Sequence, residues 1–313
     1  MYAVIDPNLP FQTIRVSKGF LSDGNRTAND IAKNSPDSSL YNPDHLLVEF
    51  IEFKNSIETR RWTCTDTVLT GKAEGVFYSP DQMVFRTPDI RLDTTALAIT
   101  RYEFRVTNKL TNQVSSASTN VPGRTMTVLQ PIADVPGDPG VLNFFTTRET
   151  TIRLSNPINS AIAQLGFRWK IQVVKNVGGV PDTSIEEWTM NSPGVSQVSP
   201  AGATNFEIKG LVGRGTFFSF MAEQGKKVSN ENVVFRRILT SPLDVYVGNK
   251  EFENYRTVNG NYNAITQSTP IYSNVSNGLG IVCSRNYRSF PFRVSNSSID
   301  TLIFRYPDLK LRR

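Results

Sequence analysis

Residues 272–284, YSNVSNGLGIVCS, combine a tight turn with a buried strand. Asn277-Gly278 is a dipeptide typical of turns, and Gly280 is a second position at which the backbone can approach a neighbouring segment closely. The apolar residues 281–283 come next and predict a strand that enters a core. We therefore assign this stretch an architectural role, as a turn that leads into one of the last strands of a β domain.

The composition indicates a folded β protein with room for two domains. The 313 residues are 39% hydrophobic and 20% charged, as in ordinary globular proteins. Phe occurs 19 times, and many Thr, Val, Ser and Asn residues favour strands and turns over helices. No apolar run is long enough to cross a bilayer as a helix.

The chain begins MYAVIDPNLP, without the basic segment and apolar core of a signal peptide, and its first five residues resemble the inside of a strand. We expect the natural protein to carry further residues before Met1, including a targeting signal.

The charges do not favour a nucleic-acid partner. The net charge of +6 results from 34 basic and 28 acidic residues, and basic pairs such as Arg60-Arg61 and Lys226-Lys227 are dispersed along the chain. Nucleic-acid-binding proteins usually concentrate such charges in one stripe or on one helix face. We expect dispersed charges of this kind to lie on solvated sheet faces.

Alternating segments in the first half predict an antiparallel sandwich. In residues 101–107, RYEFRVT, aromatic and aliphatic residues alternate with charged ones, as in a sheet with one wet face. A short helix is expected at residues 26–34, and strands at 11–18, 46–53, 62–69, 76–78, 83–86 and 114–118. This spacing is typical of an immunoglobulin-like or fibronectin-like domain, which we predict for residues 1–125.

The second half is also predicted to be all-β. Residues 126–140 are rich in Pro and Gly and indicate a linker. Residues 141–313 then form a second antiparallel domain, a sandwich or a partly closed barrel with one short helix at 249–258. Its expected strands include 167–173, 216–221 and 299–306.

The sequence offers few groups for catalysis or metal binding, and we predict no cofactor and no metal. His45 is the only histidine, and no G-x-S-x-G motif accompanies it. Glu186 and Glu187 are adjacent on an expected strand, so they point to opposite faces and cannot flank one bond. Residues 23–27 resemble half of a calcium loop, but Ala28 and Asn34 stand where Gly and an acid belong, which favours a turn with a helix cap.

The two cysteines, Cys64 and Cys283, lie in different halves of the chain. They either form a disulfide that connects the predicted domains or are two separate buried thiols, and we favour the thiols.

Two segments resemble an uncharacterised family of surface lipoproteins from Bacteroidota. Residues 4–41, from VIDPNLP to SSLY, resemble the opening pattern of that family, and residues 243–285, with LDVYVGNKEFENYRTVN and PIYSNVSNGLGIVCSR, resemble its closing signature. The resemblance implies an immunoglobulin-like N-terminal domain, a C-terminal β domain and a lipid anchor at the outer membrane, attached to a cysteine before the first strand. It implies no catalytic residues.

The tripeptides at residues 66–68, 93–95 and 300–302 resemble the Asp-Thr-hydrophobic sites at which secreted proteins of the same bacteria are O-glycosylated. They place candidate glycans on Thr67, Thr94 and Thr301.

We expect a non-catalytic cell-surface protein that binds an envelope protein or a glycan, or serves as an accessory of an envelope complex. One alternative is a glycan-processing enzyme, which would need two facing carboxylates in a cleft. The other is a glycan-binding module, which would expose aromatic residues on one sheet face, with Trp62 and Trp188 as the tryptophans to consider.

Overall fold

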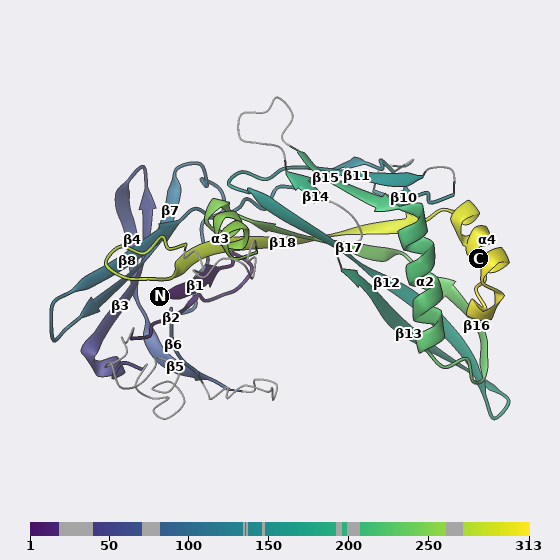
Figure 1. Ribbon diagram of the computed structural model, residues 1–313, viewed down its shortest axis with the longest axis horizontal. Helices are drawn as coiled ribbons and strands as arrows, with labels where there is room; N and C mark the ends of the chain where they lie inside the picture. The colour runs from purple at the N-terminus through teal and green to yellow at the C-terminus, as the bar shows by residue number, and fades with distance from the viewer. Residues whose placement is uncertain are drawn as a thin grey trace, which may run out of the picture. The chain divides into compact units, whose positions relative to one another are not determined.

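The computed structural model in Figure 1 describes residues 1–18, 40–70, 82–133, 135, 137–145, 148–191, 196–198, 207–260 and 272–313. The protein is all-β, with several antiparallel sheets in a sandwich-like arrangement, so the predicted fold class is confirmed. The helix predicted at residues 26–34, the strand at 76–78 and the possible calcium loop at 23–34 lie outside the described residues. Within them, no helix combines the length and the apolar character that crossing a bilayer requires.

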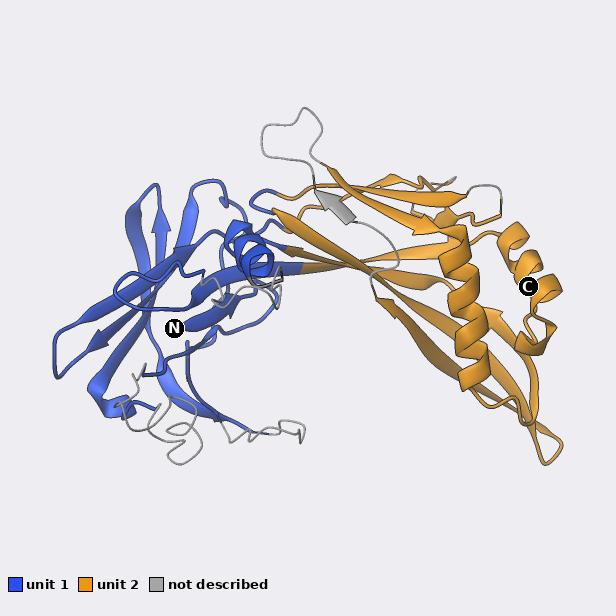
Figure 2. Cartoon of the chain, viewed as in Figure 1, with its two compact units in different colours: residues 1–123, 158–160, 248–286 blue, residues 124–157, 161–247, 287–313 orange. Residues whose placement is uncertain are grey.

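The chain divides into two compact units, coloured separately in Figure 2. Unit 1 contains residues 1–123, 158–160 and 248–286, and unit 2 contains residues 124–157, 161–247 and 287–313. This division differs from the predicted contiguous domains, 1–125 and 141–313, because the chain returns to unit 1 after residue 247. The predicted linker, 126–140, includes strand β9 (Val128–Gln130) and the start of β10 (Gly140–Leu142).

Unit 1 is built from two sheets. One has the antiparallel order β4 (Ile57–Thr63), β3 (Leu46–Lys54), β7 (Thr100–Asn108) and β8 (Val114–Thr119). The other has the order β18 (Ile281–Val294), β1 (Tyr2–Ile5), β2 (Thr13–Arg15), β6 (Gln82–Arg86) and β5 (Thr65–Leu69). Residues 281–286 of β18 belong to unit 1 and residues 287–294 to unit 2. Unit 1 also contains helix α3 (Lys250–Gly260) and the short 3-10 helix η2 (Pro43–His45).

The core of unit 1 lies between these two sheets. Phe50, Tyr102 and Phe104 from β3 and β7 are fully buried and pack ring against ring. Ile14 and Phe85 come from the other sheet and belong to the same apolar cluster. The alternation noted in residues 101–107 therefore marks the inner face of β7, as predicted.

Unit 2 also has two sheets, and helices pack on its core. In the first sheet, β13 (Val180–Asn191), β12 (Ile162–Val177), β17 (Ser241–Gly248) and β18 are neighbours in that order, with β16 (Val233–Ile238) on β12 and β10 on β18. The second sheet has the order β14 (Ser196–Val198), β15 (Glu207–Gly213), β11 (Glu149–Ser155) and β9. Helices α2 (Arg214–Lys227) and α4 (Asn296–Arg305) and the 3-10 helix η3 (Pro307–Leu309) complete the described part. Neither sheet closes on itself among the described strands.

Two predicted strands are helices. Residues 216–221 lie in α2, where Phe217 and Met221 are four residues apart and face the core together. Residues 299–306 largely form α4, which begins after Ser295, whose side chain accepts a hydrogen bond from the Ser298 main chain. Both predictions were wrong because a short apolar run fits a strand and a buried helix equally well. The predicted helix at 249–258 is confirmed as α3.

Residues 272–284 have the architecture that their glycines predict. Asn277 turns the chain with a φ of 55°, and Gly280 has a φ of 130°. A Cβ on Gly280 would lie 1.8 Å from the carbonyl oxygen of Met1, so only glycine permits this approach. Residues 281–283 are buried and pair with β1, in a parallel register that the sequence did not indicate.

Candidate functional site

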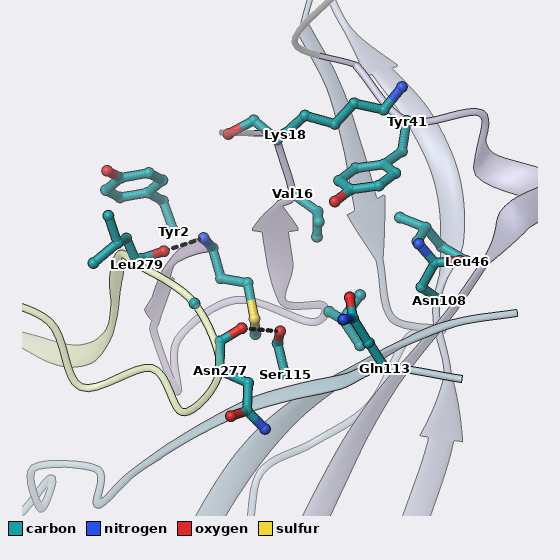
Figure 3. A pocket seen from close by; sticks show the side chains of 14 residues that line it. Tyr2, Val16, Lys18, Tyr41, Leu46, Asn108, Gln113, Ser115, Asn277 and Leu279 are labelled. Atoms are coloured by element: carbon teal, nitrogen blue, oxygen red, sulfur yellow. Dashed lines mark hydrogen bonds between the residues drawn. The ribbon is translucent and has the colours of Figure 1, made fainter. Parts of the chain in front are cut away.

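A pocket of about 510 Å³ opens in unit 1 (Figure 3). It is lined by Met1, Tyr2, Val16, Ser17, Lys18, Tyr41, Leu46, Val106, Asn108, Gln113, Ser115, Asn277, Gly278 and Leu279. Its volume lies in the range of about 300–1,000 Å³ that is usual for small-molecule sites.

The floor of the pocket is apolar. Val16 follows β2, Leu46 begins β3 and Val106 lies on β7, and all three side chains are buried in the core of unit 1. The floor is therefore an extension of the packed core and holds the pocket walls rigidly in place.

One wall is the hairpin between β7 and β8. The Asn108 side chain accepts a hydrogen bond from the Leu110 main chain over 2.9 Å, and the Asn108 main chain donates to the Gln113 carbonyl oxygen over 2.9 Å. These bonds fix the turn. The side-chain amide of Gln113 forms no hydrogen bond with any described residue and remains available to a ligand.

The adjoining wall is the turn at residues 277–279, which is bonded to β8 and to Met1. Asn277 donates its side-chain amide to the Val114 carbonyl oxygen over 3.1 Å, and its own carbonyl oxygen accepts from the Ser115 hydroxyl over 2.7 Å. The main-chain nitrogen of Met1 donates to the Leu279 carbonyl oxygen over 2.7 Å. The turn is thus both the architectural feature predicted from the sequence and one side of the pocket.

Lys18 and Tyr41 complete the rim. The Lys18 ammonium lies 5.2 Å from the centre of the Tyr41 ring, close enough for a cation–π contact. Figure 3 shows the Tyr41 hydroxyl directed into the pocket, where it forms no hydrogen bond with a described residue. None of the described residues that line the pocket is an Asp, Glu, His or Cys.

The sequence did not predict this pocket, because its walls come from distant parts of the chain. Asn277-Gly278 was visible as a turn. No local pattern indicated that it meets the β7–β8 hairpin, because the bonded Ser115 and Asn277 are 162 positions apart in the sequence.

The residues considered for catalysis lie elsewhere. His45 is in η2, where its main chain bonds to Asn42 and Lys109. Glu186 accepts a hydrogen bond from the Trp188 indole over 3.1 Å, whereas Glu187 lies 3.8 Å from the Arg168 guanidinium. The two glutamates therefore face opposite sides of β13, as predicted. Within the described residues, no group of three or more His, Cys, Asp or Glu side chains is placed to hold a metal ion.

Both cysteines are free and buried, so the prediction of two separate thiols is confirmed. Burial raises the pKa of the Cys64 thiol to about 12, with a further contribution from the charge of Glu49. Burial likewise raises the pKa of the Cys283 thiol to about 12. Both act as small apolar side chains in the core of unit 1.

The tryptophans considered for glycan binding are packed against other side chains. Trp62 lies 5.8 Å from the ring of Phe50 and under the Arg60 guanidinium, and Trp188 is 4% exposed. Neither offers a free ring to a ligand.

The three candidate glycosylation sites are on different elements. Thr67 is on β5 and Thr94 follows Asp93 in the loop before β7, and both are partly buried. Thr301 is inside α4, where its hydroxyl donates to the Ser297 carbonyl oxygen over 2.8 Å.

Comparison of the chain with models of known protein families finds no match, and a search of curated protein sequences finds none either.

Proposed function

We propose that the protein is a non-catalytic binding protein of the cell envelope and that the unit 1 pocket holds the end of a glycan. The observation that carries this proposal is the chemistry of the pocket lining. Amide, hydroxyl and ammonium groups surround an apolar floor, and the described lining residues supply no carboxylate, imidazole or thiol.

Such a lining suits a ligand rich in hydroxyl groups. The Gln113 and Asn108 side chains each carry both a donor and an acceptor, as the hydroxyls of a sugar do. Tyr2 and Tyr41 supply rings whose faces can cover the apolar side of a sugar. Lys18 adds a positive charge that would favour a sugar bearing a carboxylate or a sulfate.

The same lining does not favour the alternative of a glycan-processing enzyme in this pocket. Glycoside hydrolysis ordinarily needs an acid and a second carboxylate on either side of the scissile bond. A buried carboxylate of unit 1, Glu52, is already occupied, since it accepts hydrogen bonds from Thr59, Arg60 and Tyr102. Binding without turnover is the function that the pocket supports best.

The Gln113→Ala variant tests the pocket. We expect the wild-type protein to bind members of a glycan array, and Gln113→Ala to bind them about five- to tenfold more weakly in calorimetry, because one hydrogen bond contributes about 1 kcal/mol. Gln130→Ala, at an exposed position on β9 in unit 2, is the matched control and should bind like the wild type. Equal affinities for wild type and Gln113→Ala would remove the pocket as the site.

The envelope location is proposed on the resemblance to Bacteroidota surface lipoproteins. We expect the natural protein to incorporate an alkynyl fatty acid when it is expressed from its natural gene, and to fractionate with the outer membrane. Recovery of an unlabelled protein in the soluble fraction would contradict the lipid anchor while leaving glycan binding open.

A further inference from the structure

The first sheet of unit 2 carries a pair of tyrosines on the face opposite the core. Trp169 and Ile171 on β12 are buried in the core, so Arg168 and Lys170, which alternate with them, point to the other face. Tyr246 on β17 lies on that face and is 46% exposed. Its ring centre is 5.0 Å from that of Tyr287 on β18, with 37° between the planes.

A buried carboxylate holds one member of this pair, Tyr287, in place. Asp244 accepts hydrogen bonds from Arg168 through both Nε and Nη2, the latter over 3.1 Å, and from the Tyr287 hydroxyl over 2.7 Å. Burial by itself would raise the pKa of Asp244, but hydrogen bonds from Arg168, Tyr287 and Ser289 outweigh it and lower the pKa below its usual value. Asp244 therefore stays charged and fixes both the guanidinium and the ring of Tyr287.

The Tyr246 ring is less constrained by polar contacts. Its hydroxyl forms no hydrogen bond with a described residue, although its ring rests on that of Tyr287. The arrangement presents a supported aromatic surface to solvent, which costs hydrophobic free energy in the unbound protein.

The charges around the tyrosines are balanced. Arg168 is neutralised by Asp244 and lies 3.8 Å from Glu187, and Lys170 is directly opposite Glu187 across the β12–β13 pair. This surface therefore has little net charge but many hydrogen-bonding groups. It matches an uncharged ligand rich in hydroxyls better than an acidic or a basic polymer.

We propose that this face of unit 2 is a second binding surface, for an extended neutral polysaccharide. A sugar ring would stack on Tyr246, and its hydroxyls would bond to Arg168 and Glu187. The participating side chains lie on β13, β12, β17 and β18, which are neighbours in the sheet. Neighbouring strands are about 4.8 Å apart, comparable to the length of one pyranose ring, so successive sugars can contact successive strands.

This surface is independent of the unit 1 pocket. The proposed polysaccharide surface lies wholly in unit 2 and uses none of the pocket residues. A chain lying across a sheet face also differs from a chain end held in a pocket, so the two sites would engage different parts of a glycan.

Affinity electrophoresis of the full chain in gels that contain mannan, dextran, xylan or laminarin tests this surface. We expect at least one of these neutral polysaccharides to retard the wild-type protein, and Tyr246→Ala to weaken that binding about tenfold. Phe304→Ala, which removes an aromatic side chain that is 88% exposed on α4 of the same unit, is the matched control and should be retarded like the wild type.

Three outcomes would overturn the proposal. The first is no retardation by any of the four polysaccharides. The second is retardation only in gels that contain the acidic polymer polygalacturonate. The third is an equal loss of binding in Tyr246→Ala and Phe304→Ala, which would indicate a general effect of removing surface aromatics. Circular dichroism of each variant shows whether it folds. Tyr287→Phe is a milder variant of the same site, because it keeps the ring and loses only the bond to Asp244. We expect it to bind the polysaccharide a few-fold more weakly than the wild type.

Discussion

Replacing Gly280 by alanine is expected to lower the free energy of unfolding of unit 1 by about 3–5 kcal/mol. A φ of 130° is unfavourable for any residue with a side chain, and the new Cβ would lie 1.8 Å from the Met1 carbonyl oxygen. Because that oxygen belongs to the main chain, no side-chain rotation can relieve the contact. The Met1 segment would have to move away from β18, which would disturb the parallel pairing of Tyr2 with Ile281.

Chemical unfolding followed by circular dichroism measures this loss, and hydrogen exchange in peptides from β1 and β18 locates it. Gly278→Ala is the control, since a Cβ at Gly278 would meet its nearest atom, a methyl carbon of Val275, at 3.4 Å. We expect Gly278→Ala to cost less than about 1 kcal/mol. If both variants lost the same stability, the close approach at Gly280 would not explain why glycine is needed there.

The Asn249→Ala variant is expected to lose about 2–4 kcal/mol of stability, because it removes the centre of a buried hydrogen-bond network. The Asn249 side chain is 1% exposed and donates to the Asn120 carbonyl oxygen over 3.1 Å, as well as to the Thr119 hydroxyl and the Glu251 carboxylate. The side-chain oxygen of Asn249 accepts hydrogen bonds from the main-chain nitrogens of Phe252 and Ser284, each over 3.2 Å.

Alanine at position 249 would remove the acceptor of the Phe252 and Ser284 main-chain nitrogens, and with it the N-terminal cap of α3. Thermal and denaturant unfolding measure the loss. Asn254→Ala, in the same helix and only partly buried, is the matched control and should cost less than about 1 kcal/mol. A stability of Asn249→Ala close to that of Asn254→Ala would show that the network contributes little.

Asn249 also connects two segments that are distant in the sequence. The segment that contains VGN ends β17 and begins α3, and the segment that contains GIVCSR forms the start of β18. Asn249 bonds to Ser284, and Ser284 in turn donates its hydroxyl to the Asn120 carbonyl oxygen over 2.5 Å. These bonds form a structural junction within unit 1, in agreement with the architectural role assigned to residues 272–284.

Local patterns in the sequence determined the fold class and many of the strands. Alternation in residues 101–107 and 167–173 identifies β7 and β12, because a strand with one buried face must alternate. Neighbouring residues also indicate the turn at Asn277, the helix after Asn249 and the burial of both cysteines. These features depend on a few neighbouring residues, which the sequence displays directly.

Only the tertiary structure decided the helices α2 and α4, the division into units and both proposed binding surfaces. The apolar runs around Phe217 and Ile299 fit a strand as well as a buried helix. The core against which these residues pack determines which of the two forms. Gln113 and Asn277 face one pocket, and Arg168, Tyr246 and Tyr287 share one sheet face, because strand pairing brings distant segments together. A binding surface built from long-range pairing has no local sequence signal, so it becomes visible only when the chain is folded.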